Sequence, residues 1–200
     1  MKCCTAFLLV IAASSAHSQW LRFEFVSDPG DFIGQGQTRD ITYEQNSPDT
    51  SWFIVNLLSR GTASTGPNLL RFNMWHFGEP SDLLGARIGT DQLGHPLRVG
   101  VYENAMRASF AEPGRPGLDI SFQHRGSNQL SGRFEILDIA YTDLGTNGWR
   151  LDRFQMTFEQ HSEHVVPAMR GRITYVVPEP ASLVALGVPM LAFLRKRRSS

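Results

Sequence analysis

The sequence predicts an all-β fold, an antiparallel β-sandwich or jelly roll of roughly eight to ten strands. Short runs in which apolar and polar residues alternate recur along the chain, and this period of two is typical of half-buried strands. Clusters of glycine, proline, asparagine and aspartate separate the runs, and the 200 residues include 18 glycines and 11 prolines. Long amphipathic helical patterns are missing from the sequence, so the core has to be built from sheets.

Four strands are expected in the first half of the body. Leu21, Phe23 and Phe25 alternate with Arg22 and Glu24, which is the pattern of a strand with one buried face. Three further strands are expected at residues 39–45, 52–58 and 70–76. Turns or loops are expected between them at 28–31, 46–49 and 61–68, where turn-forming residues gather.

The second half begins less regularly. Residues 78–100 are expected to be loop-rich, and Tyr102, Met106 and Phe110 have the spacing of a helix in a segment that is short for one. A hairpin is expected at Thr146-Asn147-Gly148, because Asn-Gly is the dipeptide that most favours a tight turn between strands. The remaining strands are expected at 118–122, 132–141, 151–161 and 169–176, and the last two should pair.

Residues 1–18 have the pattern of a secretory signal peptide. Lys2 precedes a short apolar run, and Ala16-His17-Ser18 then offers small residues, Ala16 and Ser18, at the positions that a signal peptidase reads. Cleavage is expected before Gln19, which leaves residues 19–177 as one domain of ordinary size. An N-terminal anchor or a core strand is the alternative.

Residues 178–200 form a tail of three parts, which are a rigid Pro178-Glu179-Pro180 motif, an apolar run and a basic cap. The apolar run has about 14 residues, whereas a bilayer core needs ~20 helical residues, and snorkelling arginines reduce this difference. We expect a short membrane helix, with a buried C-terminal helix of the domain as the alternative. The membrane segment contains Leu183, Leu186, Leu191 and Leu194, and the cap consists of Arg195, Lys196, Arg197 and Arg198.

This tail resembles the PEP-CTERM sorting signal of Gram-negative bacteria, in which the same three parts follow in the same order. The resemblance implies that an exosortase-like membrane peptidase recognises the tail and cleaves it near residues 178–180. It implies transient anchoring in the inner membrane, with the basic cap in the cytoplasm, and then a place at the cell surface or outside the cell. Hosts of such signals typically make extracellular polysaccharide, which is therefore a candidate partner.

Without its two end segments, the body has 14 arginines, no lysine and 18 acidic residues, a formal charge of −4. This balance argues against nucleic acid as a partner, because phosphate binding needs a concentrated positive field. Cys3 and Cys4 both lie in the predicted signal peptide, so the body has no thiol nucleophile and no thiolate metal ligand. The absence of lysine excludes Schiff-base chemistry. No catalytic residue, metal site or cofactor is predicted.

Three tryptophans and one ionisable pair are the candidate binding residues. Trp52, Trp75 and Trp149 could form a platform on which sugar rings stack, although tryptophans also pack in cores and at sheet edges. Glu159 and His161 share one face of an expected strand, where they could bind a metal or pair an acid with a base. A solvated sheet face is the simpler interpretation of that pair.

We therefore expect an exported, non-enzymatic β protein that acts at the cell surface or in an extracellular matrix. A carbohydrate-binding module is the first alternative, and it requires two or more aromatic side chains in line on one exposed face. A carbohydrate-active hydrolase is the second alternative, and it requires two carboxylates ~5–9.5 Å apart in a groove.

The body also resembles a group of small bacterial exported β domains to which no activity is assigned. The resemblance is carried by residues 27–34, 102–105, 116–119, 158–161 and 167–171. In those similar sequences a cysteine stands at the positions of Ser127 and Ser162, which implies that the two positions form a disulfide there. The period of two in residues 154–162 places Ser162 on the same inward side as Phe158. We predict that Ser127 and Ser162 are neighbours.

Overall fold

The computed structural model describes residues 19–45, 51–61, 65–76 and 83–177, which form an all-β domain. The predicted signal peptide (1–18), the expected turn at 46–49 and the predicted tail (178–200) lie outside the described residues. Among the residues that are described, no helix is long and apolar enough to cross a membrane. The strands are β1 (Trp20–Ser27), β2 (Thr38–Glu44), β3 (Ser51–Leu58), β4 (Leu69–His76), β5 (Leu84–Gly89), β6 (Gly100–Arg107), β7 (Gly117–Phe122), β8 (Leu130–Asp143), β9 (Trp149–Ser162) and β10 (Met169–Val176), with two short 3-10 turns, η1 (Asp91–Leu93) and η2 (Gly145–Asn147).

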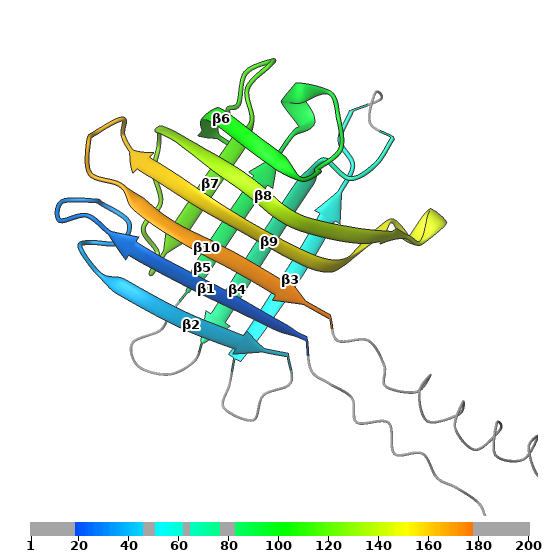
Figure 1. Ribbon diagram of the computed structural model, residues 1–200, viewed down its shortest axis with the longest axis horizontal. Helices are drawn as coiled ribbons and strands as arrows, with labels where there is room; N and C mark the ends of the chain where they lie inside the picture. The colour runs from blue at the N-terminus through cyan, green and yellow to red at the C-terminus, as the bar shows by residue number, and fades with distance from the viewer. Residues whose placement is uncertain (1–18, 46–50, 62–64, 77–82, 178–200) are drawn as a thin grey trace, which may run out of the picture. The chain divides into compact units, whose positions relative to one another are not determined.

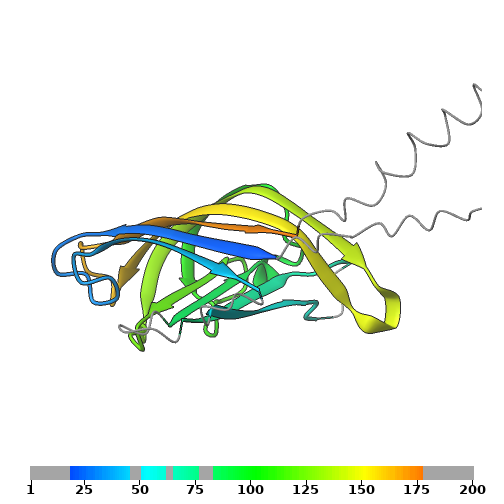
Figure 2. The same cartoon turned by 90° about the horizontal axis from the view of Figure 1, so that it is seen from below.

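All ten strands belong to one continuous sheet in the order β2-β1-β10-β9-β8-β6-β7-β5-β4-β3. Neighbouring strands are antiparallel except β6 and β7, which are parallel. The sheet folds back on itself, so that β2, β1, β10, β9 and β8 form a first layer and β7, β5, β4 and β3 form a second (Figures 1 and 2). The expected all-β class is confirmed, whereas one mixed sheet stands where a sandwich would have two separate antiparallel sheets.

Apolar side chains from both layers meet in the space between them. The predicted alternation in β1 is confirmed, since its apolar residues at 21, 23 and 25 are buried. The ring of Phe25 lies edge-on to Phe122 of β7 at 5.0 Å between centroids. Phe72 of β4 and Phe154 of β9 lie 5.8 Å apart in the same core. One continuous core therefore holds the two layers together.

A buried glutamine joins the layers where the sheet folds back. Gln160 in β9 is fully buried, and its amide oxygen accepts a 2.8 Å hydrogen bond from the backbone N–H of Ile120 in β7. Its amide nitrogen donates to the Ile120 carbonyl at 2.9 Å. Backbone pairing of β7 with β6 covers only Gly117 and Leu118. The Gln160 side chain therefore supplies Ile120 with the two bonds that a neighbouring strand would otherwise provide.

Two strands differ from the sequence-based expectation. β5 lies within residues 78–100, which were expected to be loop-rich, and its apolar residues at 84, 86 and 88 face the core. β6 occupies the segment that has helical spacing. A bulge between Tyr102 and Ala105, with Asn104 at a φ of 57°, turns both of these residues to the core. The helical spacing of Tyr102, Met106 and Phe110 therefore does not mark one buried face, because Tyr102 is buried whereas Phe110 lies beyond β6 and is exposed.

The last three strands agree with the sequence-based expectation. The hairpin expected at Thr146-Asn147-Gly148 is confirmed, and η2 forms part of the turn between β8 and β9. The expected pairing of the last two strands is confirmed as the antiparallel pair of β9 and β10.

Candidate functional site

Two of the three candidate tryptophans come together on the outer face of the second layer. The register of β3 and β4 places Trp52 opposite Trp75, and the two indoles stack with centroids 4.6 Å apart and planes inclined by 25°. Their chain neighbours Phe53 and Met74 are buried in the core, so the indoles lie on the face that points away from it. Trp52 is 43% exposed, which leaves aromatic surface for a ligand.

The third tryptophan lies apart from the stack. Trp149 begins β9 and packs edge-on against Tyr141, with ring centroids 5.5 Å apart. Trp149 and Trp52 both line a cavity of about 380 Å³, to which Leu144 and Tyr175 also contribute. Trp52 therefore belongs to both groups, stacking with one tryptophan and sharing a cavity with the other.

Glu159 and His161 belong to a chain of polar contacts that reaches the loop after β9. His161 Nε2 is 2.9 Å from Glu159 Oε1, and its Nδ1 faces two backbone carbonyls of the loop after β9. Glu159 Oε2 is 3.2 Å from Arg170 Nε, and Arg170 in turn contacts Asp28 at 2.9 Å. Burial opposes ionisation of Glu159, but hydrogen bonds from His161 and Arg170 outweigh it and lower its pKa.

The side chains of this network already bond to one another and to the loop backbone. These contacts favour the interpretation of Glu159 and His161 as part of a solvated sheet face. Within the described ranges, no group of three or more His, Cys, Asp or Glu side chains is placed to hold a metal ion.

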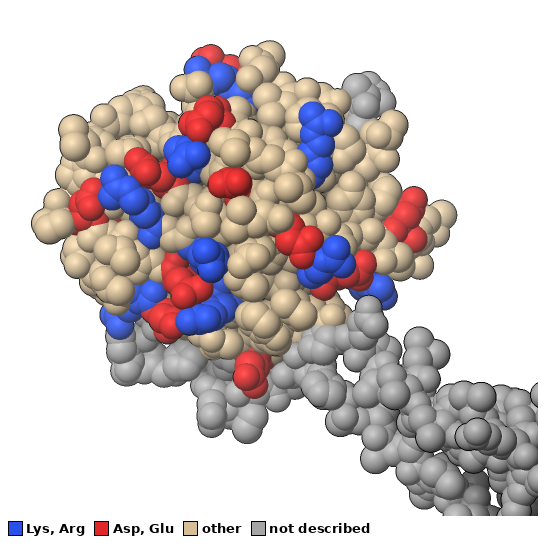
Figure 3. Space-filling model, viewed as in Figure 1, with Lys and Arg blue, Asp and Glu red and all other residues tan. Residues whose placement is uncertain are grey.

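Paired charges cover the outer face of the first layer, where basic and acidic side chains alternate (Figure 3). Glu135 and Glu159 line a cavity of about 200 Å³ on β8 and β9. A glycosidase needs one carboxyl group whose pKa is raised, whereas the pKa of Glu159 is lowered. Burial raises the pKa of Asp119, but Asp119 lies on β7 in the other layer. Glu159 in this cavity therefore does not have the raised pKa that the general acid of a glycosidase has.

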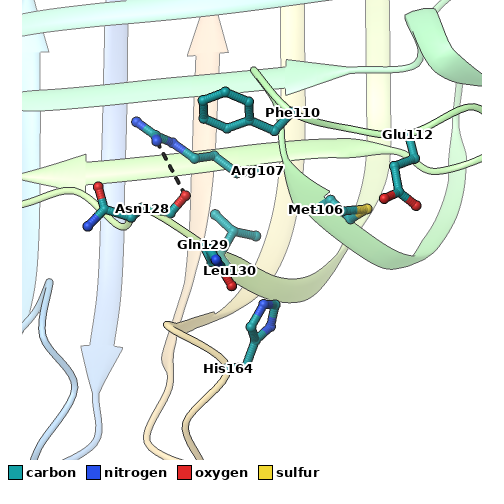
Figure 4. A pocket seen from close by; sticks show the side chains of 8 residues that line it. All are labelled: Met106, Arg107, Phe110, Glu112, Asn128, Gln129, Leu130 and His164. Atoms are coloured by element: carbon teal, nitrogen blue, oxygen red, sulfur yellow. Dashed lines mark hydrogen bonds between the residues drawn. The ribbon is translucent and has the colours of Figure 1, made fainter.

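A cavity of about 500 Å³ was not predicted from the sequence (Figure 4). Arg107 crosses it, with its guanidinium carbon 5.1 Å from the centroid of the Phe110 ring. Arg107 Nε is 3.2 Å from Asp119, and another nitrogen donates to the Asn128 carbonyl at 3.3 Å. His164 enters from the loop after β9. Only the tertiary fold brings these segments together, so no local pattern indicated the cavity.

No family model matches the chain, no curated protein is significantly similar to it, and no solved structure matches it. Its function therefore has to follow from its own residues and their geometry.

Proposed function

We propose that the protein is exported, anchored transiently in the inner membrane by its tail, and then cleaved by an exosortase-like peptidase and passed to the cell surface or the extracellular matrix. The observation that carries this proposal is the order of Pro178-Glu179-Pro180, the uncharged segment 183–194 and the four-residue basic cap. A basic cap holds its end of the segment in the cytoplasm. Proline disfavours helix in the residue before it and lacks an N–H, so a sequence of this kind favours the extended backbone that peptidases bind.

The body is proposed to act without catalysis, and carbohydrate binding is the activity that a specific observation favours. That observation is the Trp52–Trp75 stack on an outward sheet face. Aromatic faces supply large, rigid apolar surface at low entropic cost, which suits the apolar face of a sugar ring. In this proposal the folded sheet is a rigid scaffold, as a β-sandwich or jelly roll is. Its two packed layers keep the outward side chains at a fixed spacing.

Fractionation and intact-mass measurement in a host that has an exosortase test the sorting proposal. The expected product is found outside the cell, begins at Gln19 and ends near residues 178–180. A variant with Pro178→Ala, Glu179→Ala and Pro180→Ala should keep its tail and stay in the membrane fraction. The matched control Ser199→Ala/Ser200→Ala changes the tail outside its three parts and should be processed normally. Intact full-length protein in the cytosol would overturn the proposal.

Glycan-array binding of the full chain in mild detergent tests the binding proposal. Trp52→Ala and Trp75→Ala should each abolish most of the signal, because each removes half of the stack. Phe110→Ala removes an exposed aromatic ring from a different part of the surface and should bind as the wild type does. Binding that survives loss of both tryptophans, or the absence of binding to any glycan, would contradict this function.

A further inference from the structure

A row of polar side chains continues from the tryptophan stack across the second layer. Residues two apart in a strand point to the same side, so Arg71, Asn73 and Trp75 of β4 share the outer face. The register places Arg71 opposite Arg87 of β5. The step from Trp75 to Arg71 is about 13 Å along the strand. The aromatic end and the basic end of this row therefore lie within reach of one oligosaccharide.

The two arginines oppose each other, and neither forms an ion pair with another described residue. Like charges directly opposite on antiparallel strands repel. The Nε atoms of Arg71 and Arg87 are both buried and have no hydrogen-bond partner, and Arg87 is held by a 2.7 Å bond from one terminal nitrogen to Ser109 Oγ. Burial and the positive charges of Arg71 and Arg60 lower the pKa of Arg87. An anion beside the pair would relieve the repulsion and accept hydrogen bonds from terminal guanidinium nitrogens, since the buried Nε atoms are out of its reach.

Several arginines on the first layer, in contrast, form ion pairs. Arg22, Arg133 and Arg153 each have a carboxylate oxygen within 3.0 Å. Neither Arg71 nor Arg87 takes part in any ion pair found among residues 19–45, 51–61, 65–76 and 83–177. Asp119 lies opposite Arg87 in β7, but its carboxylate is bonded to Arg107 at 3.2 Å. Within the part of the chain that the structure describes, these two guanidinium groups of the second layer therefore form no direct ion pair, although Asp119 and Asp91 act on Arg87 from a longer distance.

We propose that this face binds an acidic polysaccharide, with Trp52 and Trp75 stacking on a sugar ring and Arg71 and Arg87 binding its carboxylate groups. The proposal rests on the carbohydrate-binding function given above and specifies its substrate class. The planar guanidinium group binds a carboxylate through two parallel hydrogen bonds, which gives both affinity and orientation. Asn73 lies between the aromatic and basic ends and offers an amide to sugar hydroxyls.

Single-stranded nucleic acid also combines stacking rings with anionic groups. It fits this face less well, because a phosphate recurs at every nucleotide and calls for a basic groove along the whole strand. Here the arginine pair occupies one end of the row, and the body as a whole has a formal charge of −4.

Calorimetric titration of the purified full chain in non-ionic detergent tests the proposal with three probes, namely alginate as a polymer of uronic acids, dextran as a neutral polymer, and oligo-dT. Alginate should bind about tenfold more tightly than either of the others, since charge-assisted hydrogen bonds carry discrimination of this size. Arg71→Gln/Arg87→Gln should lose that advantage. Arg133→Gln/Arg153→Gln removes the same charge from the other layer and should change the affinity less than about twofold.

Three other results of these titrations would overturn the proposal. Dextran bound as tightly as alginate would retain carbohydrate binding and overturn the acidic ligand. Oligo-dT bound more tightly than alginate would overturn the proposal in favour of nucleic acid. Unchanged alginate binding by Arg71→Gln/Arg87→Gln would also overturn it. Because the substitutions remove a repulsion, this variant should melt no lower than the wild type, and the single Arg87→Gln variant serves in its place if the double variant does not fold.

Discussion

The hydroxyl of Ser127 donates a 2.8 Å hydrogen bond to Oγ of Ser162, and both side chains are buried. Ser162 ends β9 on the same inward face as Phe158 and Gln160, while Ser127 lies in the loop between β7 and β8. The proximity predicted for these two serines is therefore confirmed. This one contact closes the loop before β8 onto the end of β9.

A disulfide should form readily at this contact. In Ser127→Cys/Ser162→Cys the two sulfurs need to approach to about 2.05 Å, somewhat closer than the present oxygens. The bridge joins positions 35 residues apart and should add about 3–4 kcal/mol to the free energy of unfolding. Thiol titration measures whether the disulfide forms, with Cys3 and Cys4 of the wild type as the reference count. Melting with and without reductant measures the stabilisation. Four titratable thiols in the oxidised, folded variant would show that the geometry is unsuitable.

Loss of the Gln160 amide should destabilise the whole fold. Gln160→Leu leaves the buried N–H and carbonyl of Ile120 unpaired, and each such group costs about 1–3 kcal/mol. We expect the free energy of unfolding in urea to fall by about 2–4 kcal/mol. Gln155→Leu, on the outward side of the same strand, is the matched control and should change it by less than about 1 kcal/mol. Equal effects of the two substitutions would argue against the role given to Gln160.

Acid should weaken the ion pairs of the first layer. Hydrogen bonds from His161 and Arg170 outweigh the opposing effect of burial and hold the pKa of Glu159 below its ordinary value of 4.5. Since the folded pKa is the lower one, this stabilisation is complete above pH 4.5 and is lost as the pH falls through the folded value. The melting temperature of Glu159→Gln should therefore be lower than that of the wild type at pH 7 and should fall less in acid.

Asp119→Asn is the control for this pH dependence. Burial raises the pKa of Asp119, so its ionisation acts in the opposite direction and its removal should leave the acid-induced loss in place. An acid-induced loss that is identical in Glu159→Gln and the wild type would contradict the assignment to Glu159.

Alkali should destabilise the domain through Tyr175. Burial raises the pKa of Tyr175 to about 12, with the charge of Asp152 acting in the same direction. The unfolded chain then ionises first, so the stabilisation present below pH 10 is lost as the pH rises toward 12. Melting between these pH values, together with the absorbance of tyrosinate, measures the effect. Tyr175→Phe should melt with a shallower alkaline decline, and an unchanged decline would assign it to another group.

The sequence indicates which side chains face the core better than it indicates how strands pair. A period of two placed Phe154, Met156 and Phe158 inward and Glu159 outward, because strand geometry fixes this locally. The bulge at Asn104 disturbs that period, so β6 was obscured. The alternation of apolar and polar residues does not show which strands are hydrogen-bonded to each other. Two separate sheets were therefore expected, whereas the structure has one sheet that folds back on itself.

For the candidate site too, the sequence indicated individual residues but did not indicate how they pair across strands. Trp52 and Trp75 were identified as binding candidates from residue type, but their stacking depends on the register of β3 and β4. The opposition of Arg71 and Arg87 depends on β5, which was expected to be loop. Long-range register is set by turn geometry and by the pattern of the partner strand. These contacts therefore became visible only with the fold.

Trp20 and Val176 are directly opposite in the pair of β1 and β10, at one end of the first layer (Figure 1). The backbone that enters the domain and the backbone that leaves it are therefore about 5 Å apart. A circular permutant, with residues 19 and 177 joined by a short linker and the chain opened in η2, would keep every strand pairing of the sheet. The order in which the strands are synthesised is thus separable from the architecture that they build.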